Sequence, residues 1–335
     1  MSTTAEDAKL VTLDEIRAAQ KRLAAVAVRT PLALIDPAAL AAEGIALPYR
    51  IHVKREDLQP IGSFKIRGAY NLLAQLPQSD LDRGVITYSS GNHAQGVAYG
   101  ARALGAKAII VMPVSAPAIK SDATAAMGAE VVFVGTASSE RRKKAEELSE
   151  KYGYTIIPPY DDARIIAGAA TCGLEIIQDE PAIDCVLTPV GGGGLLSGTC
   201  TAVKLLKPGA VIFGVEPELA ADAALSFAQK RVVELSGAET SRTVADGLRT
   251  QSVGALNLLH FLRYANGVMT VAEEEILAAM RVLAKTTGVL PEPSGAVALA
   301  AALFHPERLP GVKEIAVVIS GGNVDPALRD NILHG

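Results

Sequence analysis

Two features of this sequence combine residue types that could do chemistry: a lysine among small residues, and a run of four glycines. Lys65 lies in the segment Gly62-Ser-Phe-Lys-Ile-Arg-Gly-Ala69. A lysine amine can form a Schiff base with an aldehyde. The glycine run at 191–194 separates an apolar segment from a helix-like one, and such a turn can hold a phosphate. Pyridoxal 5′-phosphate (PLP) needs an amine for its aldehyde and a cradle for its phosphate, so the two features together predict a PLP enzyme.

The glycine run is expected to form a strand-to-helix turn. It follows Thr188-Pro-Val190, which ends an apolar segment, and a helical pattern begins at Leu195. Backbone N–H groups at a helix N-terminus point into such a turn, and the helix dipole favours an anion there. The alternative is a flexible turn without a ligand, but four consecutive glycines cost considerable conformational entropy. The run therefore predicts a phosphate site, and by itself it does not predict which ligand carries the phosphate.

Lys65 is expected at the start of a helix. The residues after it place apolar side chains at helical spacing, from Ile66 to Leu73. An ordinary lysine has a pKa of about 10.4, and a helix N-terminus and partial burial both disfavour its ammonium form. The alternative is a surface lysine on the first turn of a helix, and the local pattern alone does not separate these two interpretations.

Two further polar turns follow apolar segments. Residues 88–95, Tyr-Ser-Ser-Gly-Asn-His-Ala-Gln, separate a strand-like segment from a helix-like one. Ligands of open α/β sheets bind at the carboxyl ends of strands. Groups that could hold a carboxylate here belong to Ser89, Ser90, Asn92 and His93. The alternative is a set of helix caps, although one cap needs fewer polar groups. The second turn, Ile319-Ser-Gly-Gly-Asn323, would by itself be interpreted as a tight turn.

The segments that must position these residues alternate between strand-like and helix-like patterns. A capping box, Thr12-Leu-Asp-Glu15, opens a helix that is expected to end near Val26. The strands are apolar without alternation, which is typical of parallel strands covered on both faces. Strands are predicted at 51–54, 85–88, 108–112, 131–134, 185–190, 211–215 and 314–319. Their alternation with helices predicts a doubly wound α/β fold.

The composition argues against several other classes of protein. The chain has 335 residues, 49% of them hydrophobic, and a net charge of −4, which argues against a general nucleic-acid binder. No apolar stretch has the length of a transmembrane span, and residues 1–9 lack the apolar core of a signal peptide, so we expect a cytoplasmic protein. Buried free thiols are expected at Cys172, Cys185 and Cys200, which have no CxxC spacing.

Five segments, in order, closely resemble the motifs of one known family. They are Lys54-Arg-Glu-Asp-Leu-Gln59, Gly62 to Ala69, Ser89-Ser-Gly-Asn-His-Ala-Gln95, Pro189 to Gly194 and Ser320-Gly-Gly-Asn323. The chain resembles the serine/threonine dehydratase and serine racemase family of fold-type II PLP enzymes over residues 13–325. The resemblance implies two doubly wound domains with mostly parallel sheets, similar to the tryptophan synthase β-subunit. A large PLP-binding domain would comprise residues 1–83 and 160–335, a small mobile domain residues 84–159, and the protein would be a homodimer.

The resemblance also implies roles for individual residues. Lys65 would form the Schiff base with the cofactor and then remove the Cα proton of the substrate. The cofactor-binding residues would be Phe64, Lys65, Asn92, Gly191, Gly192, Gly193, Gly194, Leu195 and Ser320. The substrate-binding residues would be Ser89, Ser90, Asn92 and His93. In serine racemases the serine that matches Ser90 acts on the face opposite the lysine, which would make Ser90 a second catalytic residue.

Two further implications concern Ser320 and a divalent cation. The Ser320 hydroxyl would face the pyridine nitrogen, where a neutral group makes the ring a weaker electron sink than a carboxylate would, and this favours β-elimination over transamination. The segment Val215 to Asp222 resembles the family's cation site. Carboxylates would come from Glu216 and Asp222 and a backbone carbonyl from Ala220, and such hard oxygen ligands suit Mg²⁺ or Ca²⁺. The residues alone would be interpreted as an acidic loop.

The activity that the resemblance implies is dehydration and deamination of L-threonine to 2-oxobutanoate, or of L-serine to pyruvate, with release of ammonia. One alternative is a serine or aspartate racemase. Another is a dehydratase of a specialised β-hydroxy amino acid, such as 3-hydroxyaspartate or a hydroxyectoine-pathway intermediate. A protein that binds PLP or a nucleotide without catalysis is the remaining alternative, and an intact Lys65 argues against it. The sequence departs from relatives at 167–171 and at Tyr160, which leaves the substrate side chain open.

Overall fold

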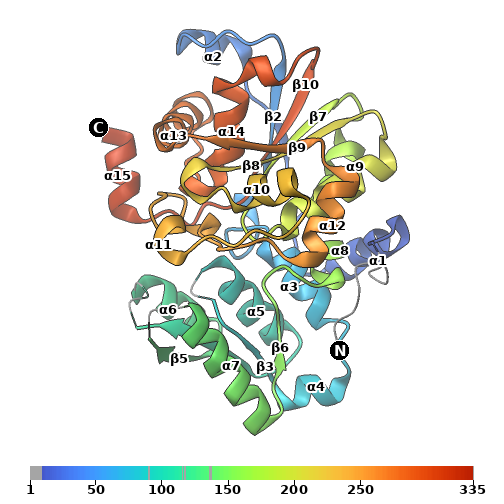
Figure 1. The fold of residues 1–335 in the computed structure, drawn as a ribbon, viewed down its shortest axis with the longest axis vertical. Helices are drawn as coiled ribbons and strands as arrows, with labels where there is room; N and C mark the ends of the chain where they lie inside the picture. The colour runs from blue at the N-terminus through green and yellow to red at the C-terminus, as the bar shows by residue number, and fades with distance from the viewer. Residues whose placement is uncertain (1–9, 90, 115, 117, 136–137, 335) are drawn as a thin grey trace.

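The fold contains two sheets of different size (Figure 1). The computed structural model describes residues 10–89, 91–114, 116, 118–135 and 138–334. The larger sheet has the strand order β1-β2-β10-β7-β8-β9, and the smaller one the order β5-β4-β3-β6. In Figure 1 the segment from β3 to β6 occupies the lower part of the molecule. Helix α3 (Lys65–Leu73) packs against α5 (Asn92–Ala103) of that part and against α8 (Ala163–Asp179) of the upper part.

The strands confirm the predicted α/β class. The larger sheet comprises β1 (Leu32–Leu34), β2 (Arg50–Arg55), β7 (Cys185–Pro189), β8 (Val211–Pro217), β9 (Gly267–Val271) and β10 (Glu314–Ile319). The smaller sheet comprises β3 (Val85–Thr87), β4 (Ala108–Pro113), β5 (Glu130–Val134) and β6 (Thr155–Ile156). Neighbouring strands are parallel except β1 and β2. All predicted strands are present, whereas β1, β6 and β9 were not predicted.

Helix α1 (Leu13–Leu23) begins at the predicted capping box. Glu15 N donates to Thr12 Oγ1 at 3.3 Å, and Thr12 N donates to Glu15 Oε2 at 2.8 Å. The helix ends at Leu23, earlier than expected. The other helices are α2 (Pro37–Ala42), α4 (Gln78–Arg83), α6 (Ala118–Ala126), α7 (Ser138–Tyr152), α9 (Gly194–Leu206), α10 (Asp222–Gln229), α11 (Gly237–Thr240), α12 (Ala255–Tyr264), α13 (Glu273–Thr287), α14 (Pro293–Phe304) and α15 (Pro326–His334).

Small residues bring α8 close to α3 and α9. A Cβ added to Gly168 would lie 2.3 Å from Arg67 O, and one added to Gly198 would lie 2.4 Å from Ala170 N. Atoms cannot pack at such distances, so only glycine fits at these two positions. Residues 167–171, where the sequence departs from relatives, belong to α8 and are buried in these contacts. The packing makes α8 a firm support for α3, the helix that carries Lys65.

Large apolar clusters pack against the larger sheet. Helix α14 packs against β10 and β7, and every residue from Pro293 to Leu303 is buried. The three cysteines are free and buried, as predicted. Within the described ranges, no helix is long and apolar enough to cross a membrane.

Candidate active site

The predicted site residues come together at the carboxyl ends of parallel strands, which is where ligands bind in open α/β sheets. Ser89 follows β3, the glycine run 191–194 follows β7, and Ser320 follows β10. Phe64 N donates to Ser320 O at 3.0 Å, which ties the segment before α3 to this edge of the larger sheet. The first residue of α3 is Lys65, so this bond places the lysine close to the turn after β10.

The amine of Lys65 has an environment that favours its neutral form. Lys65 Nζ donates to Pro159 O at 3.1 Å and lies 5.2 Å from the centre of the Phe64 ring. Part of the side chain reaches solvent, but protein surrounds the amine on most sides. This burial lowers the pKa of Lys65 to about 8, against the opposing effect of the Glu292 carboxylate. A base or nucleophile needs such an unprotonated fraction near neutral pH.

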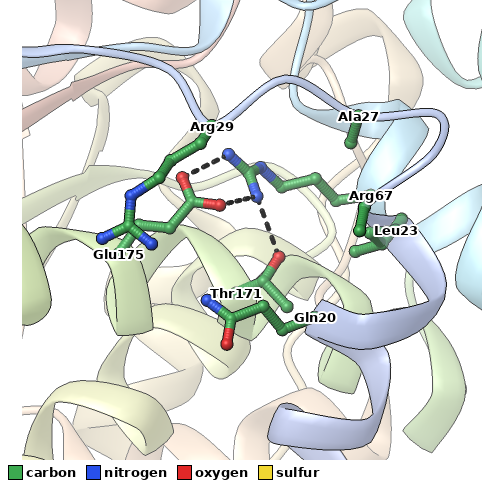
Figure 2. A pocket seen from close by; sticks show the side chains of 8 residues that line it. Gln20, Leu23, Ala27, Arg29, Arg67, Thr171 and Glu175 are labelled. Carbon is green, nitrogen blue, oxygen red and sulfur yellow. Dashed lines mark hydrogen bonds and ion pairs between the residues drawn. The ribbon is translucent and has the colours of Figure 1, made fainter.

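A buried cluster of charged side chains holds α3 in place, and Figure 2 shows two of its members, Arg67 and Glu175. Arg67 donates from Nε to Glu56 Oε2 at 2.7 Å and from Nη2 to Glu175 Oε2 at 2.8 Å. Lys54 Nζ donates to the same oxygen of Glu175 at 2.7 Å. Burial acts to raise the pKa of Glu56, but the charge and hydrogen bonds of Arg67, the Lys54 charge and the Thr30 hydrogen bond together outweigh it, and the pKa lies below its ordinary value. Because Arg67 lies two residues after Lys65, these bonds also fix the start of α3.

A cavity of about 250 Å³ adjoins this cluster. Figure 2 shows its lining, which includes Gln20, Arg29, Arg67, Thr171 and Glu175. The guanidinium of Arg67 and the carboxylate of Glu175 bond to each other and to neighbouring protein groups. Their polar atoms are therefore used within the protein, and the cavity is separate from the candidate active site.

The glycine run forms the predicted turn between β7 and α9, and its last residue, Gly194, begins the helix. Gly193 is the N-cap of α9 and has a φ of 101°, a left-handed conformation that favours glycine. A Cβ at this position would also lie 2.6 Å from Phe261 Cζ. Because Gly193 has no side chain to cap the helix, the first N–H groups of α9 remain for an anion. The next predicted residue, Leu195, is buried in the first turn of α9.

Asn92 links the turn after β3 to the larger sheet. Its Nδ2 donates to Glu292 Oε1 at 2.7 Å, and its Oδ1 accepts from Asn323 Nδ2 at 2.8 Å. The neighbouring His93 is 3% exposed, and its Nε2 lies 3.2 Å from Ile157 O. Burial lowers the pKa of His93 to about 3, so the ring is neutral. Its bond to a carbonyl places the hydrogen on Nε2 and leaves Nδ1 as an acceptor.

The serines of the predicted site differ in what the structure describes. Ser89 Oγ accepts from Gly91 N at 3.4 Å. Ser320 is buried, and its Oγ donates to Ser294 O at 3.5 Å. Ser90 lies outside the described residues, so its role as a second catalytic residue stays a prediction.

The predicted cation ligands form a buried acidic pair. Glu216 Oε1 accepts from Ala224 N at 2.8 Å, and the pKa of Glu216 is raised by burial and by the nearby Asp222 charge. Burial raises the pKa of Asp222 to about 7, and neither of its carboxylate oxygens has a hydrogen-bond partner among the described residues. The same part of the chain holds no cluster of three or more His, Cys, Asp and Glu side chains suited to a metal. A cation would therefore depend on this pair, on carbonyls such as that of Ala220, and on water.

Comparison with known proteins decides the family. A family model described as pyridoxal-phosphate dependent enzyme matches residues 26–321. The chain belongs to this family. The L-threo-3-hydroxyaspartate ammonia-lyase of Saccharomyces cerevisiae is 39% identical, over 86% of this chain and 87% of that protein. The serine racemase of Schizosaccharomyces pombe is 37% identical, over 94% of this chain and 95% of that protein.

Solved structures of pyridoxal-phosphate dependent enzymes share the fold. The crystal structure of the T.th. threonine deaminase matches with a TM-score of 0.86 and 42% sequence identity. The match covers 94% of this chain and 99% of that chain. These relatives confirm the predicted fold-type II class and the serine/threonine dehydratase and serine racemase family.

Sequence reasoning assigned no role at this site to three side chains, of which only Glu292 was not singled out. Glu292 contacts Asn92 and influences the Lys65 amine, and it belongs to a Pro-Glu-Pro segment that opens α14. A carboxylate between two prolines at the start of an apolar helix was a visible signal. Asn323 was part of a motif without an assigned role. Tyr160 was singled out only as a departure from relatives, and its contact with the glycine turn has no local sequence signal.

Proposed function

We propose that this protein dehydrates and deaminates L-threonine to 2-oxobutanoate and L-serine to pyruvate, with release of ammonia. The observation that carries the proposal is Lys65, whose pKa is lowered to about 8 at the same sheet edge as a glycine turn that leaves the start of α9 without a side-chain cap. The similarity to ammonia-lyases and to a threonine deaminase supports the same reaction class.

The residues present fit PLP. The turn 191–194 excludes side chains and presents the N-terminus of α9, which suits a phosphate, with Leu195 in the first turn. Lys65 offers the amine for the aldehyde, and the Phe64 ring beside it offers an apolar face to the pyridine. Asn92 would hold the ring hydroxyl, and Ser320 would face the ring nitrogen. When bound, PLP supplies an electron sink that makes the Cα–H bond of an amino acid acidic.

The chain's own groups would then bind the substrate and move its proton. Lys65 in its neutral form would accept the Cα proton, a step for which a pKa near 8 is well matched. The substrate carboxylate would lie at the N-terminus of α5, near Ser89, Ser90 and Asn92. The neutral His93 ring has no second N–H to donate, so we expect His93 to contribute through its backbone N–H. A neutral hydroxyl at Ser320 favours loss of the β-hydroxyl over transamination.

A divalent cation fits the acidic pair. The two buried carboxylates have raised pKa values, and among the described residues the Asp222 oxygens have no hydrogen-bond partner, so Mg²⁺ or Ca²⁺ would neutralise their charge. Glu216, Asp222 and the Ala220 carbonyl would be its protein ligands. We further propose that residues 84–159 move as a small domain over the site. We also propose that the protein is a homodimer, and light scattering would test this oligomeric state.

Two other activities have specific support. A 39% identical relative is an L-threo-3-hydroxyaspartate ammonia-lyase, and a 37% identical one is a serine racemase. Racemisation would need Ser90 as an acid or base on the face opposite Lys65. The proposed elimination would also act on 3-hydroxyaspartate, which carries a β-hydroxyl group.

The proposal is tested by keto-acid release from L- and D-serine, L- and D-threonine and the 3-hydroxyaspartate isomers. Release from L-threonine and L-serine that exceeds release from all others supports the proposal. Release mainly from a 3-hydroxyaspartate isomer would replace the substrate. No release from any of them, with a change of configuration seen by chiral chromatography, would replace elimination with racemisation.

A further inference from the structure

Tyr160 contacts the glycine turn from a distant part of the chain. It follows β6, on the path from the smaller sheet back to α8. A Cβ added to Gly192 would lie 2.1 Å from both Cδ1 and Cε1 of Tyr160. One added to Gly194 would lie 3.2 Å from Tyr160 Cβ. The tyrosine ring therefore fills the space that a side chain at Gly192 would take.

The ring is held in this position by the loop before α12. Tyr160 OH donates to Ser252 O at 3.3 Å. The neighbouring Asp161 accepts from Leu256 N at 3.0 Å, in the first turn of α12. Gly254 N in turn donates to Gly192 O at 3.1 Å. Residues 160–161, the loop and the turn therefore form one closed set of contacts.

The same segment reaches the amine of Lys65. Pro159 O accepts from Lys65 Nζ at 3.1 Å, so consecutive residues contact the lysine and the glycine turn. Burial raises the pKa of Tyr160 to about 12, so its phenol is neutral at ordinary pH. Tyr160 can therefore act by packing and by one neutral hydrogen bond, and not as an acid or base.

We propose that Tyr160 is a positioning residue for the cofactor phosphate, because its ring packs on Gly192 and its Cβ on Gly194, which holds the turn in the shape that presents the N–H groups of α9. The proposal rests on the proposed function, in which this turn binds the phosphate. Glycine backbone is otherwise free to sample many conformations, and a preformed cradle binds its ligand at a lower entropic cost. The contact also gives Gly192 a second reason to be glycine, independent of the ligand.

The experiment measures the dissociation constant of PLP from the unloaded protein by equilibrium dialysis. Tyr160→Ala is expected to weaken PLP binding about tenfold or more, a loss of about 1.4 kcal/mol. Tyr160→Phe keeps the ring and should stay within about threefold of the parent protein. Gly192→Ala should also weaken binding. The double variant should lose less than the product of the two single losses, because the new methyl group enters the space that the ring has left.

The controls use residues of the same type away from the turn. Gly209→Ala adds a Cβ with no atom within 4 Å, and Tyr152 is 50% exposed on α7, so Gly209→Ala and Tyr152→Ala should leave the PLP dissociation constant unchanged. Far-UV circular dichroism checks that each variant is folded. If Tyr160→Ala does not fold, Tyr160→Leu takes its place. Its loss of PLP affinity should be larger than that of Tyr160→Phe and smaller than that expected for Tyr160→Ala.

Two results would overturn the positioning role of Tyr160. One is parental PLP affinity in Tyr160→Ala or Tyr160→Leu. The other is single losses that multiply in the double variant, which would mean that the two residues act independently. Parental affinity in Gly192→Ala would instead contradict the phosphate site itself, and with it the cofactor assignment of the proposed function.

Discussion

Replacing Glu292 by glutamine is expected to make Lys65 more reactive at neutral pH. Burial lowers the pKa of Lys65 to about 8, and the Glu292 carboxylate acts against this decrease. Glutamine keeps an oxygen that can accept the 2.7 Å hydrogen bond from Asn92 Nδ2, but it removes the negative charge. Burial is then unopposed, so the pKa of Lys65 in Glu292→Gln should lie below about 8.

The size of the effect follows from the protonation equilibrium. At pH 7 an amine with a pKa of about 8 is roughly 9% unprotonated, whereas one at the ordinary 10.5 is roughly 0.03% unprotonated. The site therefore increases the free amine about 300-fold at this pH. Each further unit by which Glu292→Gln lowers the pKa would increase the free amine by up to about tenfold, until the amine is mostly neutral.

Competitive acetylation of the unloaded protein measures this pKa directly. Trace acetic anhydride is added between about pH 6 and about pH 10, and the acetylated fraction of Lys65 is determined by peptide mass spectrometry. Glu274→Gln removes one charge from an exposed residue of α13 and is the matched control. A midpoint near 10.5 in the parent protein would refute the reasoning, as would a midpoint in Glu292→Gln that stays the same or rises.

Three other predictions concern the cation pair, the buried cluster and the ring nitrogen. Because the folded-state pKa of Asp222 is raised from 3.8 to about 7, its contribution to stability is full below pH 3.8 and is lost as pH rises through 7. Chelated protein should lose up to about 4 kcal/mol over that window, and Mg²⁺ or Ca²⁺ should restore it at pH 8. In urea unfolding, Asp222→Asn should reduce the pH-dependent loss, with the remainder due to Glu216, and should abolish the effect of the cation; indifference to chelator would contradict the site. Arg67→Met should cost about 3–5 kcal/mol, because it leaves Glu56 buried without its ion-pair partner and removes one of the two cations from Glu175. Arg164→Met at a partly exposed pair should cost less than about 1 kcal/mol by thermal denaturation. Equal losses of stability in Arg67→Met and Arg164→Met would mean that the cluster does not hold α3. Ser320→Asp should shift products from keto acid and ammonia toward transamination, measured as the fraction of cofactor converted to its amine form; an unchanged ratio would contradict the role of the neutral hydroxyl.

Strands buried on both faces could be predicted from the sequence, and so could β5, which is partly exposed but has an unbroken apolar run; β1, β6 and β9 could not. Apolar runs such as 108–112 and 314–319 appear as β4 and β10 within a residue of the expected bounds. Strand β9 has partly exposed residues and contains Gly267 and Thr270, so its apolar pattern is weaker. Strand β6 is two residues long, and no pattern can indicate so short an element.

The site was predictable where one segment carried the chemistry, and not where distant segments meet. The glycine turn, Lys65 and the acidic pair each lie in a short local motif. The buried cluster of Arg67, Glu56 and Glu175 joins three elements through side chains far apart in sequence, so only the folded chain brings it together. The contact between Tyr160 and the turn is of the same kind. The motif at 54–59 supplies Lys54 and Glu56 to the buried cluster. It therefore has a structural role, which the sequence alone did not indicate.

The central claim is that Lys65 carries a PLP-dependent elimination on threonine and serine. The most direct measurement compares keto-acid release from L-threonine and L-serine by the PLP-loaded protein and by its Lys65→Ala variant at equal protein concentration. The account predicts release of 2-oxobutanoate and pyruvate by the parent protein, and none above background by a Lys65→Ala variant that is folded. Substantial release by the variant would contradict the role of Lys65, and no release by the loaded parent protein would contradict the proposed substrates.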